Sequence, residues 1–165
     1  MSKHPATCDL CDAHKNDSSG SFRVLPPVFR DFGAVRRFSG AVVTVKCHED
    51  NSRVKELLGT PGQGKVLVVD GGGSLRCALM GDMIGESAVK NGWEGVIIYG
   101  CVRDVDALAE LDLGVHAVAA IPLKSVRKGV GETGLDITFG GVTFVQGQYV
   151  YADNNGVIAA TRKLV

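Results

Sequence analysis

Short runs of hydrophobic residues recur along the chain and alternate with segments of mixed polarity. Four of these runs are rich in β-branched or small apolar residues, as expected of strands: Phe38–Cys47, Gly64–Asp70, Gly95–Gly100 and Val115–Pro122. The run that ends at Asp70 is continuous rather than alternating, which is typical of a strand buried on both faces. The pattern therefore predicts a sheet whose strands are separated by other elements.

Helix signals occupy most of the intervals between these runs. Asn51–Gly59 has the pattern of a capped helix that ends at a glycine, and a second helix is expected from Asp82, as its N-cap, to Asn91–Gly92. A third helix is expected within 102–114, and Thr7 is expected to cap a short helix that runs to about His14. The segment Ser74–Met80 is ambiguous between strand and helix.

The pattern changes beyond Lys124. Short β runs follow one another there, separated by Gly-Gly, Gln-Gly and Asn-Asn-Gly turns. The 165 residues are long enough for a real core and short enough for one domain. We therefore expect a single domain over residues 1–165, of the α/β class, with a β-rich C-terminal part.

Composition and charge exclude several classes of function. Lys and Arg total 18, as do Asp and Glu, and no basic arm or patch is visible, so direct binding of nucleic acid is not expected. The apolar runs are too short to span a bilayer, and no membrane association is expected. The N-terminus has no apolar signal core, which predicts a cytoplasmic protein.

Five cysteines are spread along the chain. Their odd number favours reduced thiols over a disulfide framework. Cys8 and Cys11, with His4 and His14 nearby, have the spacing of half a zinc site, but no second pair of ligands follows at regular spacing. The favoured interpretation is a helix that carries both cysteines on the same face.

The segment "VVDGGGSLR", Val68–Arg76, has some features of a nucleotide-binding loop. Gly71 and Gly73 fit the first two positions of the dinucleotide fingerprint, but Arg76 occupies the third. There is also no Lys-Ser or Lys-Thr pair of the kind that a phosphate-binding loop requires. The three glycines are therefore expected to form a tight chain reversal.

Polar residues follow two of the expected strands, where ligands bind in open α/β sheets. Asp82 lies at the start of one helix, and Arg103 and Asp104 follow the next strand, with 20 residues between Asp82 and Arg103. An anion site would be formed by the backbone N–H groups of Gly81, Asp82, Met83 and Ile84. Arg103 would hold a carboxylate, and Asp104 would ligate a hard divalent cation.

Structural roles are the alternative for each of these residues. Asp82 would serve as an N-cap alone, and Arg103 with Asp104 would form a surface ion pair at a helix start. Asp70 and Asp153 are further candidate ligands, although acids at turns are usually turn formers.

Four segments resemble the RraA-like family: "VLVVDGGGSLRCALMGD", "NGWEGVIIYGCVRDVDAL", "LDLGVHAVAAIP" and "FGGVTFVQGQYVYADNNGVI". The most specific element is an Asp-x20-Arg-Asp motif, met by Asp82, Arg103 and Asp104. The family includes regulators of ribonuclease E and metal-dependent 4-hydroxy-4-methyl-2-oxoglutarate aldolases. The resemblance implies a swivelling β/β/α-type domain in a ring-shaped homotrimer, with active sites between subunits.

The resemblance also implies roles for the residues of the motif. Asp104 would hold Mg²⁺ or Mn²⁺ largely through water, and Arg103 would bind the keto-acid end of the substrate. The amides of Gly81–Ile84 would bind its carboxylate, and Asp82 would orient a metal-bound water or assist proton transfer. No Schiff-base lysine is needed, so Lys65, Lys90 and Lys124 are interpreted as solvated or C-terminal helix charges.

Three functions are compatible with these features. The first is a metal-dependent lyase that cleaves 4-hydroxy-4-methyl-2-oxoglutarate to two pyruvates and decarboxylates oxaloacetate, both through a pyruvate enolate. The second is a protein regulator that binds and inhibits ribonuclease E without chemistry. The third, a methyltransferase that uses S-adenosylmethionine, rests only on "VVDGGGS" and ranks far behind.

Overall fold

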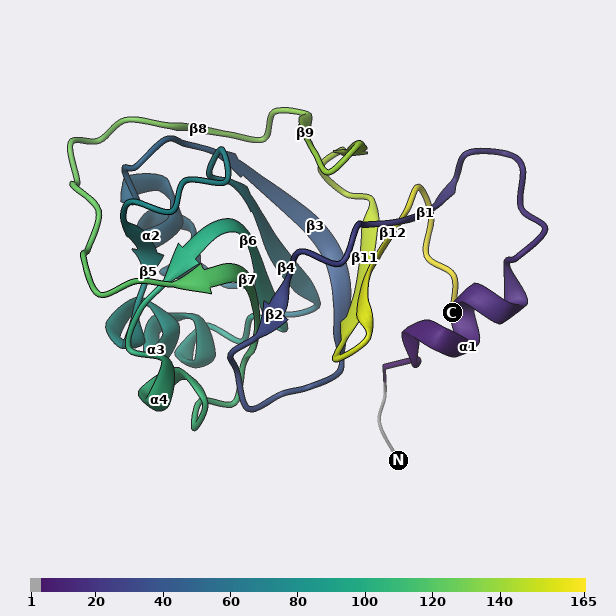
Figure 1. Ribbon diagram of the computed structural model, residues 1–165, viewed down its shortest axis with the longest axis horizontal. Helices are drawn as coiled ribbons and strands as arrows, with labels where there is room; N and C mark the ends of the chain where they lie inside the picture. Colours follow the sequence, from purple (N-terminus) through teal and green to yellow (C-terminus); the bar gives the residue numbers. More distant parts are fainter. Residues whose placement is uncertain (1–3) are drawn as a thin grey trace.

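The computed structural model describes residues 4–165 and contains one large sheet with helices packed against it (Figure 1). Its central strands run in the order β11, β3, β4, β6, β7, with β12 and β1 beyond one side and β2 beyond the other. The strands of this sheet are β1 (Phe22–Val24), β2 (Arg30–Asp31), β3 (Phe38–Lys46), β4 (Lys65–Asp70), β5 (Ala78–Met80), β6 (Gly95–Val102), β7 (Gly114–Ala120), β8 (Glu132–Thr133), β11 (Tyr149–Asp153) and β12 (Gly156–Ala160).

Strands β3, β4, β6 and β7 are parallel, and β5 adds a short parallel segment beside β6. Each connection between neighbouring parallel strands contains a helix. Helix α2 (Ser52–Leu58) lies between β3 and β4, α3 (Asp82–Lys90) between β5 and β6, and the short α4 (Val105–Leu108) between β6 and β7. Because these strands are parallel, their carboxyl ends lie at the same edge of the sheet, on the left in Figure 1. The β-rich end of the chain continues the sheet with antiparallel strands β11 and β12.

Two hydrophobic cores lie on opposite faces of the central strands. One face packs against the three helices, through Leu67, Val69 and Ile98 of the sheet. The other packs against a hairpin of β9 (Ile137–Phe139) and β10 (Val142–Phe144), through Val66 and Val68. Alternate residues of β4 therefore enter different cores, which explains why its sequence is a continuous apolar run.

Helix α1 (Thr7–Ala13) packs outside the sheet against β11 and β12, near the C-terminus of the chain (Figure 1). The Asp153 carboxylate fixes its first turn, because it accepts bonds from the Thr7 amide at 2.8 Å and the Thr7 hydroxyl at 2.7 Å. The sequence predicts Thr7 as the N-cap of this helix, and that prediction is wrong. Ala6 occupies that position, and the Thr7 hydroxyl is directed to the β11–β12 turn instead.

The four strands expected from the hydrophobic runs are confirmed, with small shifts at their ends. The helix expected within 102–114 is much shorter, because β6 extends to Val102 and only Val105–Leu108 is helical. Beyond Leu108 the chain makes tighter turns with hydrogen bonds between residues three positions apart, such as Leu111 N–H to the carbonyl of Leu108. Within residues 4–165, no helix is long and apolar enough to cross a membrane.

Candidate functional site

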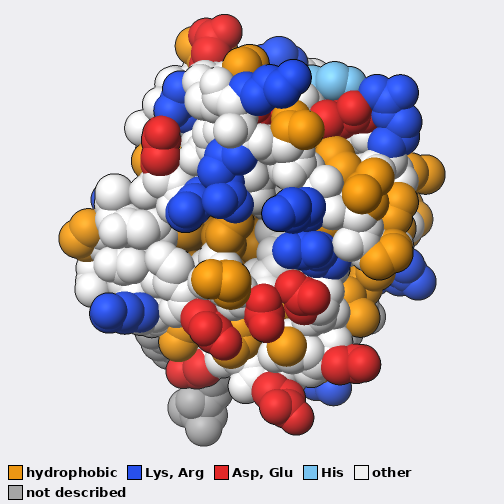
Figure 2. Space-filling model, turned by 90° about the vertical axis from the view of Figure 1, so that its left-hand side faces the viewer, with side chains coloured by type: hydrophobic (Ala, Val, Ile, Leu, Met, Phe, Trp, Pro, Cys, Tyr) orange, Lys and Arg blue, Asp and Glu red, His pale blue; other side chains and the backbone are white. Residues whose placement is uncertain are grey.

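The residues of the Asp-x20-Arg-Asp motif meet at the carboxyl ends of β5 and β6. The Arg103 amide donates to the Met80 carbonyl at 2.9 Å, which places the residue after β6 beside the start of α3. Figure 2 views this end of the molecule and shows Lys and Arg side chains gathered on it, beside a group of Asp and Glu side chains. The sheet topology therefore brings together Asp82 and Arg103, which have 20 residues between them in the sequence.

Asp104 has a left-handed backbone conformation, with φ of 55°. Its Oδ2 accepts a hydrogen bond from the Asp82 amide at 3.1 Å and lies 3.8 Å from Arg103 Nε. Asp104 is the first residue before α4, yet its side chain makes no cap bond to that helix. Its carboxylate instead caps the neighbouring helix α3, and a non-glycine residue with positive φ at this place marks a constrained position.

Gly81 provides the space for this carboxylate. A Cβ at position 81 would collide with Asp104 Oδ2 and would also press on the Arg103 side chain. The backbone of Gly81 is extended, so close approach rather than a special φ requires glycine here. Gly81 is also the N-cap of α3, and Asp82 is the first helical residue, so the expected N-cap role of Asp82 is wrong.

The start of α3 has the donors of an anion site. Asp104 already occupies the Asp82 amide, whereas the Met83 and Ile84 amides belong to the first turn and have no intrahelical acceptor. The Met83 side chain is 80% exposed and leaves this turn open to solvent. An incoming carboxylate would meet these amides and the guanidinium of Arg103 together.

A cleft of about 90 Å³ lies at this point, and its lining includes two cations that the sequence did not indicate. Lys124 lines the cleft because Ser125 N–H donates to the Ala78 carbonyl, which pairs the segment after β7 with β5. Lys124 is exposed, in agreement with its interpretation as a solvated charge, but the sequence analysis gave it no place at the cleft. Like Arg103, Lys124 follows the carboxyl end of a parallel strand, and this position in the sequence could have indicated that it lies at the cleft.

Arg127 is the second additional cation, and a buried side chain orients it. Its Nε donates to Asn51 Oδ1 at 3.2 Å, while Asn51 Nδ2 donates to the Leu79 carbonyl at 3.1 Å. The cleft thus combines three cations, Arg103, Lys124 and Arg127, with the carboxylates of Asp82 and Asp104. This balance favours an anionic ligand.

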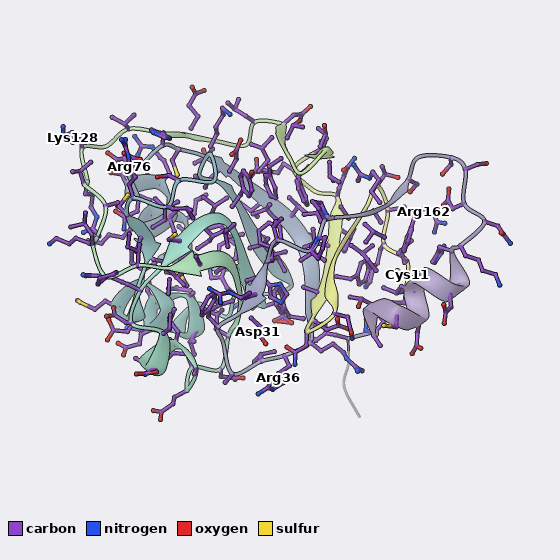
Figure 3. The ribbon with its side chains drawn as sticks, in the orientation of Figure 1. Cys11, Asp31, Arg36, Arg76, Lys128 and Arg162 are labelled. Atoms are coloured by element: carbon purple, nitrogen blue, oxygen red, sulfur yellow. The ribbon has the colours of Figure 1, made fainter. Side chains whose placement is uncertain are left out.

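A larger hollow of about 560 Å³ adjoins the cleft and shares Lys124 and Ser125 with it. Arg76 and Lys128 also line it, and Figure 3 shows both at the same end of the molecule. The Arg76 guanidinium bonds to both oxygens of Glu49, at 2.6 and 2.7 Å. These two hydrogen bonds, and a third from Ser74, lower the pKa of Glu49 to about 2.

The glycine segment forms the tight chain reversal expected from the sequence. Gly72 and Gly73 have φ of 69° and 68°, and the amides of Gly71 and Gly73 both donate to the Tyr99 carbonyl. The Asp70 carboxylate accepts the Gly72 amide at 2.9 Å and the Lys46 ammonium at 3.1 Å. Asp70, like Asp153, is therefore held by its own turn.

No cluster of three or more His, Cys, Asp or Glu that could hold a metal occurs in residues 4–165. Cys8 and Cys11 both lie on helix α1, as the favoured interpretation predicts, and both are free thiols. Magnesium, however, is usually held by one or two carboxylates and several waters. Asp104 and Asp82 supply carboxylate groups of this kind at the cleft.

The sequence profile of the RraA-like family (Aldolase/RraA) matches residues 7–159. A protein of Acinetobacter baylyi is 64% identical over 164 residues, which cover 96% of this chain and 95% of the relative. One of Alcanivorax borkumensis is 61% identical, over 96% of this chain and 98% of the relative. Both are provisionally named 4-hydroxy-4-methyl-2-oxoglutarate aldolase.

Two solved structures have the same fold. One, titled S-adenosylmethionine:2-dimethylmenaquinone methyltransferase from Geobacillus kaustophilus, has a TM-score of 0.92 and 42% identity, over 97% of each chain. The other, titled the RNA-processing inhibitor RraA from Thermus thermophilus, has a TM-score of 0.91 and 38% identity, over 98% of this chain and 96% of that one. The expected α/β fold is confirmed, and this chain belongs to the RraA-like family.

Proposed function

We propose that the protein is a divalent-metal-dependent lyase that cleaves 4-hydroxy-4-methyl-2-oxoglutarate to two pyruvates. The observation that carries this proposal is the cleft in which Arg103, Asp104 and the first amides of α3 converge. The names of the relatives, up to 64% identical, support the same substrate. Oxaloacetate would be decarboxylated at the same residues, because that reaction also produces a pyruvate enolate.

The residues of the cleft fit a hard cation such as Mg²⁺ or Mn²⁺. Asp104 would hold it largely through water, since Oδ2 is engaged by the Asp82 amide while Oδ1 makes no hydrogen bond within residues 4–165. A cation here supplies Lewis acidity that stabilises negative charge on the substrate's former keto oxygen.

The chain's own groups bind and orient the substrate. The carboxylate of the keto-acid end lies against the amides of Met83 and Ile84, and Arg103 holds this end by charge-assisted bonds. The cleft's volume of about 90 Å³ suits one pyruvyl unit. Lys124, at the boundary with the larger hollow, then faces the rest of the substrate.

Cleavage requires a proton to leave the substrate's C4 hydroxyl. Asp82 accepts it, directly or through an ordered water, as the C3–C4 bond breaks. The bonding electrons move to the enolate oxygen, where the fixed charge of Arg103 stabilises them. One pyruvate then leaves, and the enolate takes a proton at C3 to give the second.

Pyruvate release, followed with lactate dehydrogenase and NADH, tests this function. We expect EDTA to stop release from 4-hydroxy-4-methyl-2-oxoglutarate, and Mg²⁺ or Mn²⁺ to restore it. Arg103→Lys and Asp104→Asn should each lower kcat/KM at least a hundredfold, since each removes a group that acts on the developing charge. Arg162→Lys, on the exposed C-terminal segment, is the matched control.

Two results would contradict the proposal. One is unchanged turnover in the Arg103 or Asp104 variant. The other is full activity after exhaustive removal of divalent cations. Oxaloacetate should respond to the same variants in the same order, because both substrates use one cleft.

We also propose that the protein assembles as a homotrimer with its sites between subunits. Several large apolar side chains are exposed around the hollow beside the cleft, and Figure 2 shows hydrophobic side chains along this part of the surface. They are Leu75, Leu123, Val126 and Val130, with exposures of 53% to 64%. An exposed apolar group of this kind is typical of an interaction site.

Binding to ribonuclease E is the second candidate function. It is supported by the Thermus structure, titled an RNA-processing inhibitor, at 38% identity. Immobilised protein should retain ribonuclease E at micromolar concentration, and absence of binding at that concentration would exclude this role. The cleft variants Arg103→Lys and Asp104→Asn should leave binding unchanged if an outer surface carries it.

The methyltransferase name of the Geobacillus structure has no support in the glycine segment of this chain. Gly71 and Gly73 bond to the Tyr99 carbonyl, and the space above Gly73 is filled by the Tyr99 ring. Isothermal titration with S-adenosylmethionine would test this, and we expect no binding heat.

A further inference from the structure

A second cluster of polar residues lies far from the Arg103–Asp104 cleft. His4 Nδ1 is 2.7 Å from the hydroxyl oxygen of Ser39, and His4 Nε2 is 3.5 Å from Glu94 Oε1. Ser39 is the second residue of β3, and Glu94 directly precedes β6. The three residues come from distant parts of the sequence, so the fold brings them together.

This order of groups is that of an activated serine. A hydroxyl within hydrogen-bond reach of an imidazole, which a carboxylate orients from its other nitrogen, is the arrangement that makes serine nucleophilic. In the neutral tautomer that carries its proton on Nε2, on the side of Glu94, Nδ1 has the lone pair that would accept the Ser39 proton. The side chains of His4 and Glu94 are only 14% and 16% exposed, which limits competition from water.

The cluster opens into a hollow of about 240 Å³. Its walls include Tyr149, Tyr151 and Val165, which are suited to a small apolar acyl group. Lys163 also lines the hollow and supplies a positive charge for an oxyanion. A second hollow, of about 430 Å³, meets the first at His4 and Glu94 and gives the leaving group an exit.

We propose that Ser39, His4 and Glu94 form a second catalytic site that hydrolyses esters of small carboxylic acids. The Ser39 oxygen bonds to the ester carbonyl carbon while His4 takes the hydroxyl proton. The bond to the alcohol oxygen then breaks, and the alcohol leaves with the proton held by His4. Water, deprotonated by His4, attacks the acyl-serine and releases the acid, which restores Ser39.

The site is independent of the proposed lyase site. It lies at the amino ends of β3 and β6, whereas Arg103 and Asp104 follow the carboxyl end of β6. The eight residues of β6 separate the two sites by roughly 26 Å. Ser39→Ala should therefore abolish ester hydrolysis and leave pyruvate release unchanged, so failure of one proposal does not affect the other.

Reaction with a fluorophosphonate, on protein without an N-terminal tag, provides the test. A peptide map should place the phosphonyl group on Ser39, and Ser39→Ala should remove it. His4→Gln and Glu94→Gln should slow labelling, the former about a hundredfold, because general-base assistance is lost. Ser18→Ala and His14→Gln, both outside the cluster, are the matched controls and should label at the wild-type rate.

Hydrolysis of p-nitrophenyl acetate gives a second readout. We expect a burst of p-nitrophenolate equal to the enzyme concentration, absent in Ser39→Ala. A purely structural cluster would give a different result: His4→Gln would lower the melting temperature, while wild-type Ser39 would take no label. Labelling that His4→Gln leaves unchanged would also overturn the proposal.

Discussion

Asp104 reaches the start of α3 only because three local conditions are met. Its backbone adopts the left-handed conformation, Gly81 leaves room for its carboxylate, and the Asp82 amide donates to it. Aspartate tolerates positive φ better than most residues, and its short side chain suits this reach. The position of the carboxylate is therefore set by backbone geometry more than by side-chain packing.

Substitution of Gly81 by alanine tests this dependence. The new Cβ would collide with Asp104 Oδ2, so the carboxylate must move, and a displacement of about 1 Å costs on the order of a hundredfold in rate. We expect kcat for pyruvate release to fall by about that factor, with a small change in melting temperature. Glu86→Ala, exposed on α3, is the control, and equal activity in the two variants would contradict this account.

His116 is a buried residue that gives folding a pH dependence. It is 2% exposed, and neither ring nitrogen has a hydrogen-bond partner in residues 4–165. Burial lowers its pKa to about 4, against a smaller opposing effect of Asp153. Because the unfolded chain binds this proton near pH 6.5, the folded state loses stability as the pH falls from about 6.5 to 4.

Urea unfolding of wild type and His116→Leu at pH 7.5 and pH 4.5 tests this effect. The wild type should lose on the order of 3 kcal/mol more than the variant over this interval, because the pKa of His116 is about 4 in the folded protein and about 6.5 in the unfolded chain. His48→Gln, an exposed histidine, should behave as the wild type. An equal loss in His116→Leu would show that other groups cause the pH dependence.

The sequence predicts Asp82, Arg103 and Asp104 as site residues because ligands bind at strand ends and because the motif spacing is specific, and the structure brings the three together. It did not identify Arg127, and it gave Lys124 no place at the cleft. Lys124 reaches the cleft through the bridge between its segment and β5, and Arg127 through a bond to Asn51. Such contacts between segments far apart in sequence leave no local periodic signal.

At the scale of elements, the central strands and helices α2 and α3 were predictable from hydrophobic pattern and caps. The length of α4 was not, since β6 continues through Val102 and the Arg103 amide is bonded to β5. Residues 123–131, the segment after β7, have little regular structure. Hydrogen bonds to Ala78 and Asp50 hold this segment against the carboxyl ends of the strands. This segment carries Lys124 and Arg127, so its fastening positions part of the cleft.

Asp50 is a principal fastening point of that segment. Its carboxylate accepts bonds from Ser52 and from the Lys128 amide at 2.7 Å. Burial raises the pKa of Asp50, but these bonds and one from the Val130 backbone outweigh it and bring the pKa to about 2. The contribution to stability is therefore complete above about pH 4 and is lost as the pH falls towards 2.

Asp50→Asn weakens these bonds at neutral pH. We expect the free energy of unfolding to fall by about 1–3 kcal/mol, and KM for the keto acid to rise as Lys124 and Arg127 lose their positions. Asp136→Asn, at an exposed position, is the matched control. A loss of stability without any change in KM would show that the segment does not position the cleft.

At the scale of the whole molecule, the exposed apolar side chains beside the cleft make assembly testable. If the proposed trimer forms through this surface, Leu123→Lys and Val130→Lys should convert it to smaller species and reduce pyruvate release, because a charge would replace an apolar side chain at the interface. Val24→Lys changes an equally exposed side chain on the distant strand β1. Sedimentation velocity distinguishes the species, and a wild-type monomer would refute the trimer.

The Asp104 carboxylate that caps α3 places a negative charge beside the amides proposed for the substrate. Because Asp104 occupies the Asp82 amide, the Met83 and Ile84 amides are the donors left for an incoming carboxylate in this turn. A divalent cation held by Asp104 would offset the repulsion between these two anions. The cation would then raise the affinity for the substrate, and the substrate would raise the affinity for the cation by the same factor.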